Sequence, residues 1–354
     1  MPLFLEVKKP GLLTTVQDMG RWGHQAMGMP VAGAMDPEAL AVANVLAGNE
    51  PEAAALEVTL LGPTLSVEGQ GAVAVAGADL GFCLNGKPAP LWTCLPVNPG
   101  DTLSFSGPKG NGGRAVLAVS GGIDVPAVMG SRSTYVRAAI GGFSGRPLKA
   151  GDRLASGELP PLWRKTVDFS CPESLRPVRD PEAPIRAVPG PQDDAFTEEG
   201  IETLFGSAYT ISNQADRMGY RMEGPKIAHK AAADIVSDAI PLGAIQVPGH
   251  GQPIVMLADR QTTGGYTKAA VVLTADLAVL AQRIPGQSVR FARSTPEEGA
   301  RLLAERASRT ARLIGLRTEY RSRPSEGAPE KSPGSGNWKL TCQGRTYTVQ
   351  WQEL

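Results

Sequence analysis

The sequence has no net charge, few aromatic residues and no long apolar run, and each shortage excludes a class of protein. Its 35 Lys and Arg balance 35 Asp and Glu, so no excess of positive charge is available for a nucleic-acid backbone or an anionic membrane. No run of about 18 apolar residues occurs, so we expect no transmembrane span. The N-terminus carries Lys8, Lys9 and Pro10 where a signal peptide would need an apolar core.

Cysteine and histidine are also scarce. The four cysteines, at 83, 94, 171 and 342, are far apart and form no C-x-x-C pair, which argues against a zinc site and a disulfide framework and favours a cytoplasmic location. No two of the three histidines, at 24, 229 and 250, have a metal-binding spacing, so no metal site is expected. Phosphate-loop, dinucleotide-binding, zinc-protease and nucleophile-elbow motifs are also missing from the sequence.

Glycine and proline, in contrast, are abundant, with 42 and 30 residues in a chain of 354. This composition favours a turn-rich, mainly β protein rather than a helical bundle. Short apolar runs between turns predict strands at 65–67, 72–75, 102–105, 115–119, 254–257 and 289–291. N-cap, first-turn proline and acidic signals predict helices at about 37–46, 193–205, from 274 to before 285, and from 294 to about 313.

Composition along the chain suggests two β halves. We expect an N-terminal half at 1–160, a proline-rich connection at 161–184 and a C-terminal half with a terminal helix at 185–316. A linker is expected at 317–336, because its residues are mostly Pro, Ser, Gly, Glu and Lys. The last residues, 337–354, have the pattern of a hairpin, which is marginal alone and is expected to dock on another surface.

Polar residues gather beside glycines in several segments. Gln and Arg side chains recognise amides and carboxylates by paired hydrogen bonds, and glycine lets a backbone N–H approach a ligand oxygen. The strongest candidate is 259–265, because it directly follows the apolar strand 254–257. The candidate residues are Gln17, Asp18, Arg21, Asp36, Arg132, Ser133, Thr134, Arg146, Gln192, Asp216, Arg217, Gln246, Asp259, Gln261, Thr262 and Thr263.

Structural roles compete at several of these positions. Asp36 has the pattern of a plain helix N-cap, which would explain the residue fully. Asp18 and Arg21 can form a local ion pair, worth about 0–1 kcal/mol if exposed. Arg132 and Arg146 can each satisfy loop carbonyls.

The segments also occur in a recognisable order between about Leu5 and Ala292. They include Gln17-Asp18 with Gly20-Arg21, Gly33-Ala34-Met35-Asp36, Leu56-Glu57, Gly130-Ser131-Arg132-Ser133-Thr134, Gly190-Pro191-Gln192, Asp216-Arg217-Met218-Gly219, Gln246-Val247-Pro248 and Gln261-Thr262-Thr263-Gly264-Gly265-Tyr266. In this order they resemble the biotin-dependent carboxyltransferase, or allophanate hydrolase subunit 2, family. The resemblance implies two tandem cyclophilin-like β-barrel domains with a few capping helices.

That family includes the C subunit of an ATP-dependent 5-oxoprolinase, the carboxyltransferase domain of urea carboxylase and an antagonist of a sporulation-kinase inhibitor. The resemblance therefore implies, first, hydrolysis of the lactam of 5-oxoproline to glutamate with ATP, in a complex with a B-type subunit and an A-type subunit. One alternative is biotin-dependent carboxyl transfer to urea or a related amide. The other is a regulatory partner without catalysis.

Under the first function, the candidate residues divide into two groups. Asp18, Arg21, Asp216, Arg217 and Asp259 are expected to be catalytic, and the other candidates are expected to bind the substrate. The ATP site is expected to be shared with the partner subunits because the sequence lacks a phosphate loop. Biotin is required only under the carboxyltransferase alternative.

Two features depart from the family pattern. Ala215 precedes Asp216 where the family usually has a serine, which removes a hydroxyl but keeps Asp216 and Arg217. The tail from Trp338 to Leu354 is similar to the first hairpin of a biotinyl carrier domain, yet it has no Ala-Met-Lys-Met biotinylation site. A truncated remnant or a docking hairpin would explain this tail.

Overall fold

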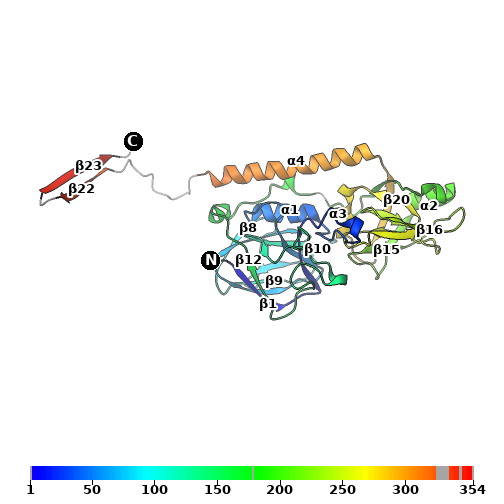
Figure 1. The fold of residues 1–354 in the computed structure, drawn as a ribbon, viewed down its shortest axis with the longest axis horizontal. Helices are drawn as coiled ribbons and strands as arrows, with labels where there is room; N and C mark the ends of the chain where they lie inside the picture. Colours follow the sequence, from blue (N-terminus) through cyan, green and yellow to red (C-terminus); the bar gives the residue numbers. More distant parts are fainter. Residues whose placement is uncertain (1, 178, 324–334, 343–344, 353–354) are drawn as a thin grey trace.

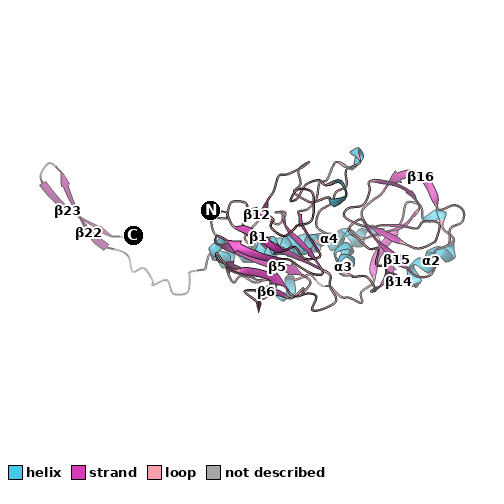
Figure 2. Cartoon of the chain, turned by 90° about the horizontal axis from the view of Figure 1, so that it is seen from below, coloured by secondary structure: helices cyan, strands magenta, loops and turns pink. Residues whose placement is uncertain are grey.

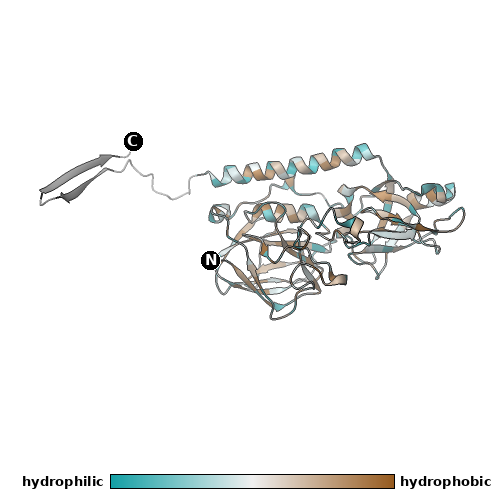
Figure 3. Cartoon of the chain, viewed as in Figure 1, coloured by the Kyte–Doolittle hydropathy of each residue, from teal (hydrophilic) through white to brown (hydrophobic). Residues whose placement is uncertain are grey.

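The computed structural model describes residues 2–177, 179–323, 335–342 and 345–352. Two β units lie side by side along the long axis of the molecule, as Figures 1 and 2 show. Figure 3 shows that apolar residues concentrate on the strands of both units. The prediction of a mainly β protein with few helices is confirmed.

The N-terminal unit consists of two sheets that face each other across one apolar core. The seven-stranded sheet has the order β11-β12-β1-β4-β9-β6-β7, and the five-stranded sheet has the order β2-β3-β10-β5-β8. The first contains β1 (Phe4–Lys9), β4 (Thr64–Glu68), β6 (Phe82–Leu84), β7 (Lys87–Pro88), β9 (Thr102–Phe105), β11 (Ile123–Asp124) and β12 (Arg153–Ser156), and the second contains β2 (Leu13–Gln17), β3 (Ala55–Thr59), β5 (Gly71–Gly77), β8 (Cys94–Val97) and β10 (Arg114–Val119).

Strand β10 explains why a helix covers this unit. All six of its residues are buried, and its side chains alternate between the two faces of the sheet. Leu117 and Val119 point into the core between the sheets, while Val116 and Ala118 pack against α1 (Pro37–Leu46). The helix begins as expected, because the Asp36 carboxylate accepts a hydrogen bond from the Ala39 N–H.

The C-terminal unit is a closed barrel with the order β13-β20-β17-β18-β15-β14-β21, which confirms the predicted barrel. Helices α2 (Glu198–Gly206) and α3 (Thr274–Gln282) pack on it, and a two-stranded ribbon, β16 (Asp234–Ala239) with β19 (Thr263–Tyr266), accompanies it. The barrel strands are β13 (Ile185–Pro189), β14 (Ala208–Ile211), β15 (Gly219–Glu223), β17 (Ala244–Gln246), β18 (Ile254–Met256), β20 (Lys268–Val272) and β21 (Ser288–Arg293).

Helix α4 (Pro296–Arg321) follows the barrel in sequence but runs back along the N-terminal unit (Figure 1). It begins at the Thr295 N-cap, whose hydroxyl accepts from the Glu298 N–H. Leu313 belongs to the core beside α1, and Arg317 donates to the carbonyls of Val45 and Asn49. The helix is therefore longer than the sequence predicts, because packing on the other unit stabilises its second half.

The connections contain short 3-10 helices, and the tail contains a hairpin. The former are η1 (Gln25–Met27), η2 (Val136–Ala138), η3 (Trp163–Thr166), η4 (Glu173–Leu175) and η5 (Asp193–Ala195). In the tail, β22 (Ser335–Cys342) pairs with β23 (Arg345–Gln352) in antiparallel register, which confirms the hairpin. Its docking on another surface stays a prediction. Among the helices of the described residues, none has the length and apolar character that crossing a membrane requires.

The two units are joined by direct hydrogen bonds. The Ala32 N–H donates to the Ala258 carbonyl at 3.0 Å. The Arg114 guanidinium donates to the Tyr220 hydroxyl and the Ala281 carbonyl, both at 3.0 Å. Gln282 of α3 exchanges two hydrogen bonds with the backbone of Arg114. These hydrogen bonds form a junction between the two units, and some of the polar candidate residues lie in it.

Candidate functional site

Asp18 follows β2 and holds together a loop from a distant part of the chain. Its Oδ1 accepts hydrogen bonds from the Gly20 N–H at 2.8 Å and the Ser131 hydroxyl at 2.6 Å, and also from the Ser133 hydroxyl. Its Oδ2 accepts from the Arg132 N–H at 2.5 Å. Both carboxylate oxygens are thus occupied by the protein, so the geometry assigns Asp18 to organising this loop.

Arg21 lies beneath the same loop and is 1% exposed. It donates to the carbonyls of Ser133 and Val128, and its Nη1 has no partner within the described part of the chain. Burial lowers the pKa of Arg21, against the opposing charges of Asp18 and Asp259. No ion pair of Arg21 with Asp18 occurs among the described residues, so the proposed local pair is not formed.

Arg217 joins the two units through a buried network of charges. Its Nε and Nη2 donate to the two carboxylate oxygens of Asp259 at 3.1 and 2.9 Å. Its Nη1 donates to the Glu57 carboxylate, and its Nη2 donates to the Gly33 carbonyl at 2.6 Å. Burial alone would lower the pKa of Arg217, but the charges of Asp259 and Glu57 outweigh it and raise that pKa. Every nitrogen of this guanidinium is therefore bound within the protein.

Asp36 also lies at the junction rather than in a cavity. Besides capping α1, its carboxylate accepts from the Gln282 amide at 2.8 Å and from Arg179 at 2.9 Å. Burial would raise the pKa of Asp36, but the Arg179 charge and these hydrogen bonds outweigh it and lower the pKa. The N-cap alternative thus explains this residue, with an added role in joining α1 to α3.

Four further candidates make contacts within the N-terminal unit. The Gln17 amide donates to the Thr134 carbonyl at 3.2 Å, and the Thr134 hydroxyl donates to the Val16 carbonyl. Arg132 donates to the Val125 carbonyl at 2.8 Å. Arg146 forms a two-pronged ion pair with Asp152 at 2.7 and 2.8 Å.

Gln192 belongs to a second polar group, near the base of the β16–β19 ribbon. Its side-chain Nε2 lies 3.3 Å from the Asp238 carboxylate, and its Oε1 accepts from the Lys268 N–H. The Lys268 side chain is fully buried, and its Nζ donates to the same Asp238 oxygen at 3.0 Å. The hydrogen bond from Lys268 lowers the pKa of Asp238. Lys268 pairs with Gln246 across β20 and β17, so this group adjoins the next one.

Gln246 and Gln261 each have one unpartnered amide atom, and their side-chain amides lie close to the same glycine. The Nε2 of Gln246 and the Oε1 of Gln261 are buried and have no hydrogen-bond partner in the described chain. The Nε2 atoms of both glutamines lie within 3.4 Å of the position that a Cβ on Gly264 would occupy. The Ile240 Cδ1 lies only 2.7 Å from the same position, so the lack of a side chain at Gly264 lets these three side chains approach closely. Of the neighbouring candidates, Thr263 is exposed on β19 and Thr262 offers its carbonyl to Ile240.

The two glutamines line a cavity of about 300 Å³, which we call the glutamine cavity. Asp216 is also on its wall, with Oδ1 accepting from the N–H groups of Met218 and Gly219. His250 also lines the cavity. Its Nδ1 accepts a hydrogen bond from the Gln252 N–H, so its Nε2 is the ring nitrogen that can bind a ligand. The remaining polar wall is formed by Arg137, Arg221 and Tyr266.

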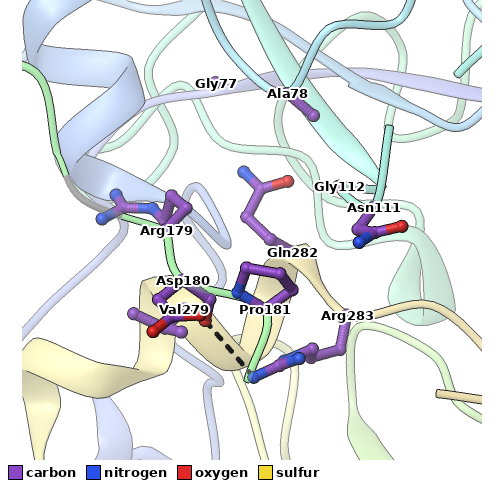
Figure 4. Close-up of a pocket in the computed structure, with 10 residues that line it drawn as sticks. All are labelled: Gly77, Ala78, Asn111, Gly112, Arg179, Asp180, Pro181, Val279, Gln282 and Arg283. Carbon is purple, nitrogen blue, oxygen red and sulfur yellow. Dashed lines mark hydrogen bonds between the residues drawn. The ribbon is translucent and has the colours of Figure 1, made fainter. Parts of the chain in front are cut away.

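Another cavity, of about 260 Å³, lies where the connection between the units meets α3 (Figure 4). Its two arginines are engaged by the protein. Arg179 pairs with Asp36 and Glu38, and Arg283 donates to the carbonyls of Asp180 and Ala183. This cavity therefore offers fewer free polar groups than the glutamine cavity.

Apart from Thr262 and Thr263, the candidates thus lie in three places. Gln246, Gln261 and Asp216 meet in the glutamine cavity, with Gln192 beside it. Arg217, Asp259 and Asp36 form the junction of the units. Asp18 and Arg21, with Gln17, Arg132, Ser133, Thr134 and Arg146, belong to the N-terminal loops. No group of three or more His, Cys, Asp or Glu side chains suited to a metal is present in the described ranges.

Sequence reasoning missed several residues of these groups. Glu57 stands out in the sequence only as part of a motif, because its partner Arg217 is 160 positions away. The sequence around Lys268 indicates a strand, but the burial of its side chain becomes apparent only when the barrel is formed. Arg137 reaches the glutamine cavity from η2 of the other unit. No local signal in the sequence marks these three contacts.

Comparisons with known proteins agree with this architecture. The family model "Carboxyltransferase domain, subdomain A and B" matches residues 27–293. The C subunit of 5-oxoprolinase from Escherichia coli (strain K12) is 39% identical over 296 residues, which cover 83% of this chain and 92% of that protein.

Longer proteins contain a similar region. The urea amidolyase of Lachancea kluyveri is 36% identical over 315 residues, covering 82% of this chain but 17% of that protein. The crystal structure of the K. lactis urea amidolyase superposes with a TM-score of 0.82 at 32% identity, covering 88% of this chain and 20% of that chain.

Proposed function

This chain belongs to the carboxyltransferase domain family, subdomains A and B, and we propose that it is the C subunit of a 5-oxoprolinase complex. In this proposal the complex opens the lactam ring of 5-oxoproline to glutamate with ATP. The extent of the similarity supports this choice, because the aligned region covers 92% of the C subunit of the E. coli 5-oxoprolinase. Relatives of this kind are enzyme subunits, so a role within an enzyme complex follows from the family.

The pair of unpartnered amide atoms carries the proposal. A five-membered lactam holds its C=O and N–H on the same edge, because the ring forces the amide into the cis form. The Gln246 Nε2 can donate to the lactam oxygen while the Gln261 Oε1 accepts from the lactam N–H. Both groups are buried, so an unfilled pair leaves two unsatisfied polar atoms, and a bound amide would satisfy both.

The glutamine cavity also offers groups that can hold a proton. Asp216 uses Oδ1 for two backbone N–H groups, which leaves Oδ2 for a water or for the ring nitrogen. His250 lies on the same wall. Asp18 and Asp259 are less suitable as bases because the protein occupies both oxygens of each carboxylate. We therefore assign proton transfer to Asp216, with His250 as its neighbour.

ATP would supply the driving force by phosphorylating the amide oxygen, since an unactivated lactam resists water. The sequence contains no phosphate loop, so the proposal assigns completion of the ATP site to a B-type and an A-type partner subunit. The role of this chain is then to orient the lactam edge and to place Asp216 beside the ring nitrogen.

Carboxyl transfer from biotin to urea or a related amide is the second candidate. Two observations favour it, the name of the matching family and the similarity to urea amidolyase. The ureido ring of biotin also presents N–H and C=O groups along one edge, so the same glutamine pair fits it. Biotin, like 5-oxoproline, would be held by Gln246 and Gln261.

The experiment uses the chain co-purified with its A-type and B-type partners. We expect ATP hydrolysis that depends on 5-oxoproline and yields glutamate, no such activity from the chain alone, and loss of activity in Gln246→Leu and Gln261→Leu. Gln70→Leu is the control, because Gln70 is exposed on the N-terminal unit. An inactive full mixture would exclude the proposal, and carboxylation of urea by a biotin carrier would establish the alternative.

A further inference from the structure

A second pair of cavities lies between the two units, beside the glutamine cavity. Their volumes are about 560 and 230 Å³. Both are lined by Trp22 and Val31 of the N-terminal unit and by Leu242, Arg260 and Thr274 of the C-terminal unit. We call these two cavities, with their shared wall, the arginine groove. Gln261 separates the larger cavity from the glutamine cavity, since it lines both.

Arg260 is the cation of this groove, and it is 6% exposed. Its Nε donates to the Ile240 carbonyl at 2.9 Å and its Nη1 to the Leu257 carbonyl at 3.4 Å. These bonds fix the plane of the guanidinium, while its Nη2 makes no hydrogen bond to any described residue. Within the described chain, no carboxylate lies within 4 Å of Arg260.

Arg21 and Arg283 are also buried and, among the described residues, also lack an ion pair within 4 Å, but carboxylates farther away still act on their pKa values. The charges of Asp18 and Asp259 act on Arg21, and those of Glu182 and Asp180 act on Arg283. Burial is the single influence on the pKa of Arg260, which it lowers to about 10. The side chain is therefore still a cation at pH 7, in surroundings that supply no counter-charge. Burying an unpaired charge is costly, so an anion in the groove would be strongly favoured.

The walls restrict what kind of anion fits. Trp22, Val31 and Leu242 line both cavities, and Leu257 and Leu277 line the smaller one. Arg306 also reaches the smaller cavity, but its guanidinium lies 3.5 Å from Glu38. One unpaired cation among apolar walls suits a single negative charge on an apolar body, and a guanidinium binds a planar carboxylate by two parallel hydrogen bonds.

We propose that the arginine groove binds a small monocarboxylate with an apolar body, whose carboxylate pairs with Arg260. This site is separate from the lactam site of the proposed function and does not depend on it. The volumes are within the range of small-molecule sites. Gln261 lines both sites, so a ligand in the groove would change the position of the Gln261 side chain in the glutamine cavity.

Binding to the isolated full chain tests the proposal without any activity assay. Benzoate is the probe, benzamide is its uncharged equivalent, and inorganic phosphate is an anion without an apolar body. Binding is followed by calorimetry and by the NMR signal of the Trp22 indole, since this side chain is 56% exposed at the groove. We expect benzoate to bind at least about tenfold more tightly than benzamide or phosphate, because the charge-assisted pair is lost with either.

Two variants and one control locate the site. Arg260→Gln should weaken benzoate binding by about tenfold or more, whereas Arg283→Gln, which changes a buried arginine of another cavity, should leave it unchanged. If Arg260→Gln does not fold, Leu242→Trp fills the groove without touching the charge and should also abolish binding. Equal affinity for benzoate and benzamide, or no shift of the Trp22 signal at saturation, would overturn the proposal.

Discussion

Replacing Arg217 by Met should destabilise the whole molecule. The change removes a guanidinium that binds two buried carboxylates, Asp259 from its own unit and Glu57 from the other. Removing one partner of a buried ion pair costs about 3–5 kcal/mol, because the remaining charge stays buried without compensation. For domains of this size, about 2–4 °C of melting temperature is lost per kcal/mol, so we expect a decrease of roughly 6–20 °C.

The measurement is thermal unfolding by calorimetry at pH 7, with Arg146→Met as the matched control. Arg146 also binds a carboxylate with two prongs, but it is partly exposed on a loop, so its loss should cost about 1 kcal/mol or less. The triple variant Arg217→Met, Glu57→Gln, Asp259→Asn removes the stranded charges and should recover part of the loss. A melting temperature for Arg217→Met within about 2 °C of the wild type, with activity abolished, would refute this reasoning and return Arg217 to the catalytic group.

Three further predictions concern other parts of the structure. The pKa of Asp36 is lowered in the fold, so its charge stabilises the protein above the ordinary pKa of aspartate, and that contribution is lost as the pH falls through the lowered pKa. Asp36→Asn keeps an N-cap and should be about 1.5–3 kcal/mol less stable than wild type in urea at pH 7, with the difference shrinking toward pH 3; a constant difference would contradict this. Gly264→Ala places a methyl group 2.7 Å from the Ile240 Cδ1 and within 3.4 Å of both glutamine amide nitrogens, so these side chains must shift. The KM for 5-oxoproline should therefore rise about tenfold, with a decrease in melting temperature from the displaced Ile240, and an unchanged KM would count against the glutamine site. Leu313→Ala should cost about 2–5 kcal/mol of unfolding free energy, whereas Leu303→Ala, on the exposed face of α4, should change it by about 0.5 kcal/mol or less.

Local features of the fold could be predicted from the sequence. Asp36 and Pro37 identify the start of α1 because a cap and a first-turn proline act within one turn. The predicted strands correspond to β4, β5, β9, β10, β18 and β21, with Leu257 one residue beyond the end of β18. The end of α4 could not be predicted, since Arg317 is held by carbonyls of the N-terminal unit rather than by local propensity.

The candidate site was predictable residue by residue but not as a group. Gln246 and Gln261 are candidates because such side chains bind amides. Their convergence depends on Gly264 and on the ribbon that carries it, which no local pattern describes. Arg217 and Asp259 have the composition of a binding site as well, yet they contact each other and Glu57. Side-chain type indicates what a residue can bind, and only the fold determines whether a ligand or the protein fills that role.

The path of α4 has a consequence for limited proteolysis. The connection between the units exposes Asp180 and Glu182 to solvent, so a glutamate-specific protease can cut the chain there. The second fragment would still hold the first, because Leu313 packs on α1, Arg317 donates to the Val45 and Asn49 carbonyls, and Arg217 binds Glu57. A nicked protein should therefore elute as one species in native buffer and separate into two pieces only in denaturant. The covalent connection is thus not what keeps the two units together.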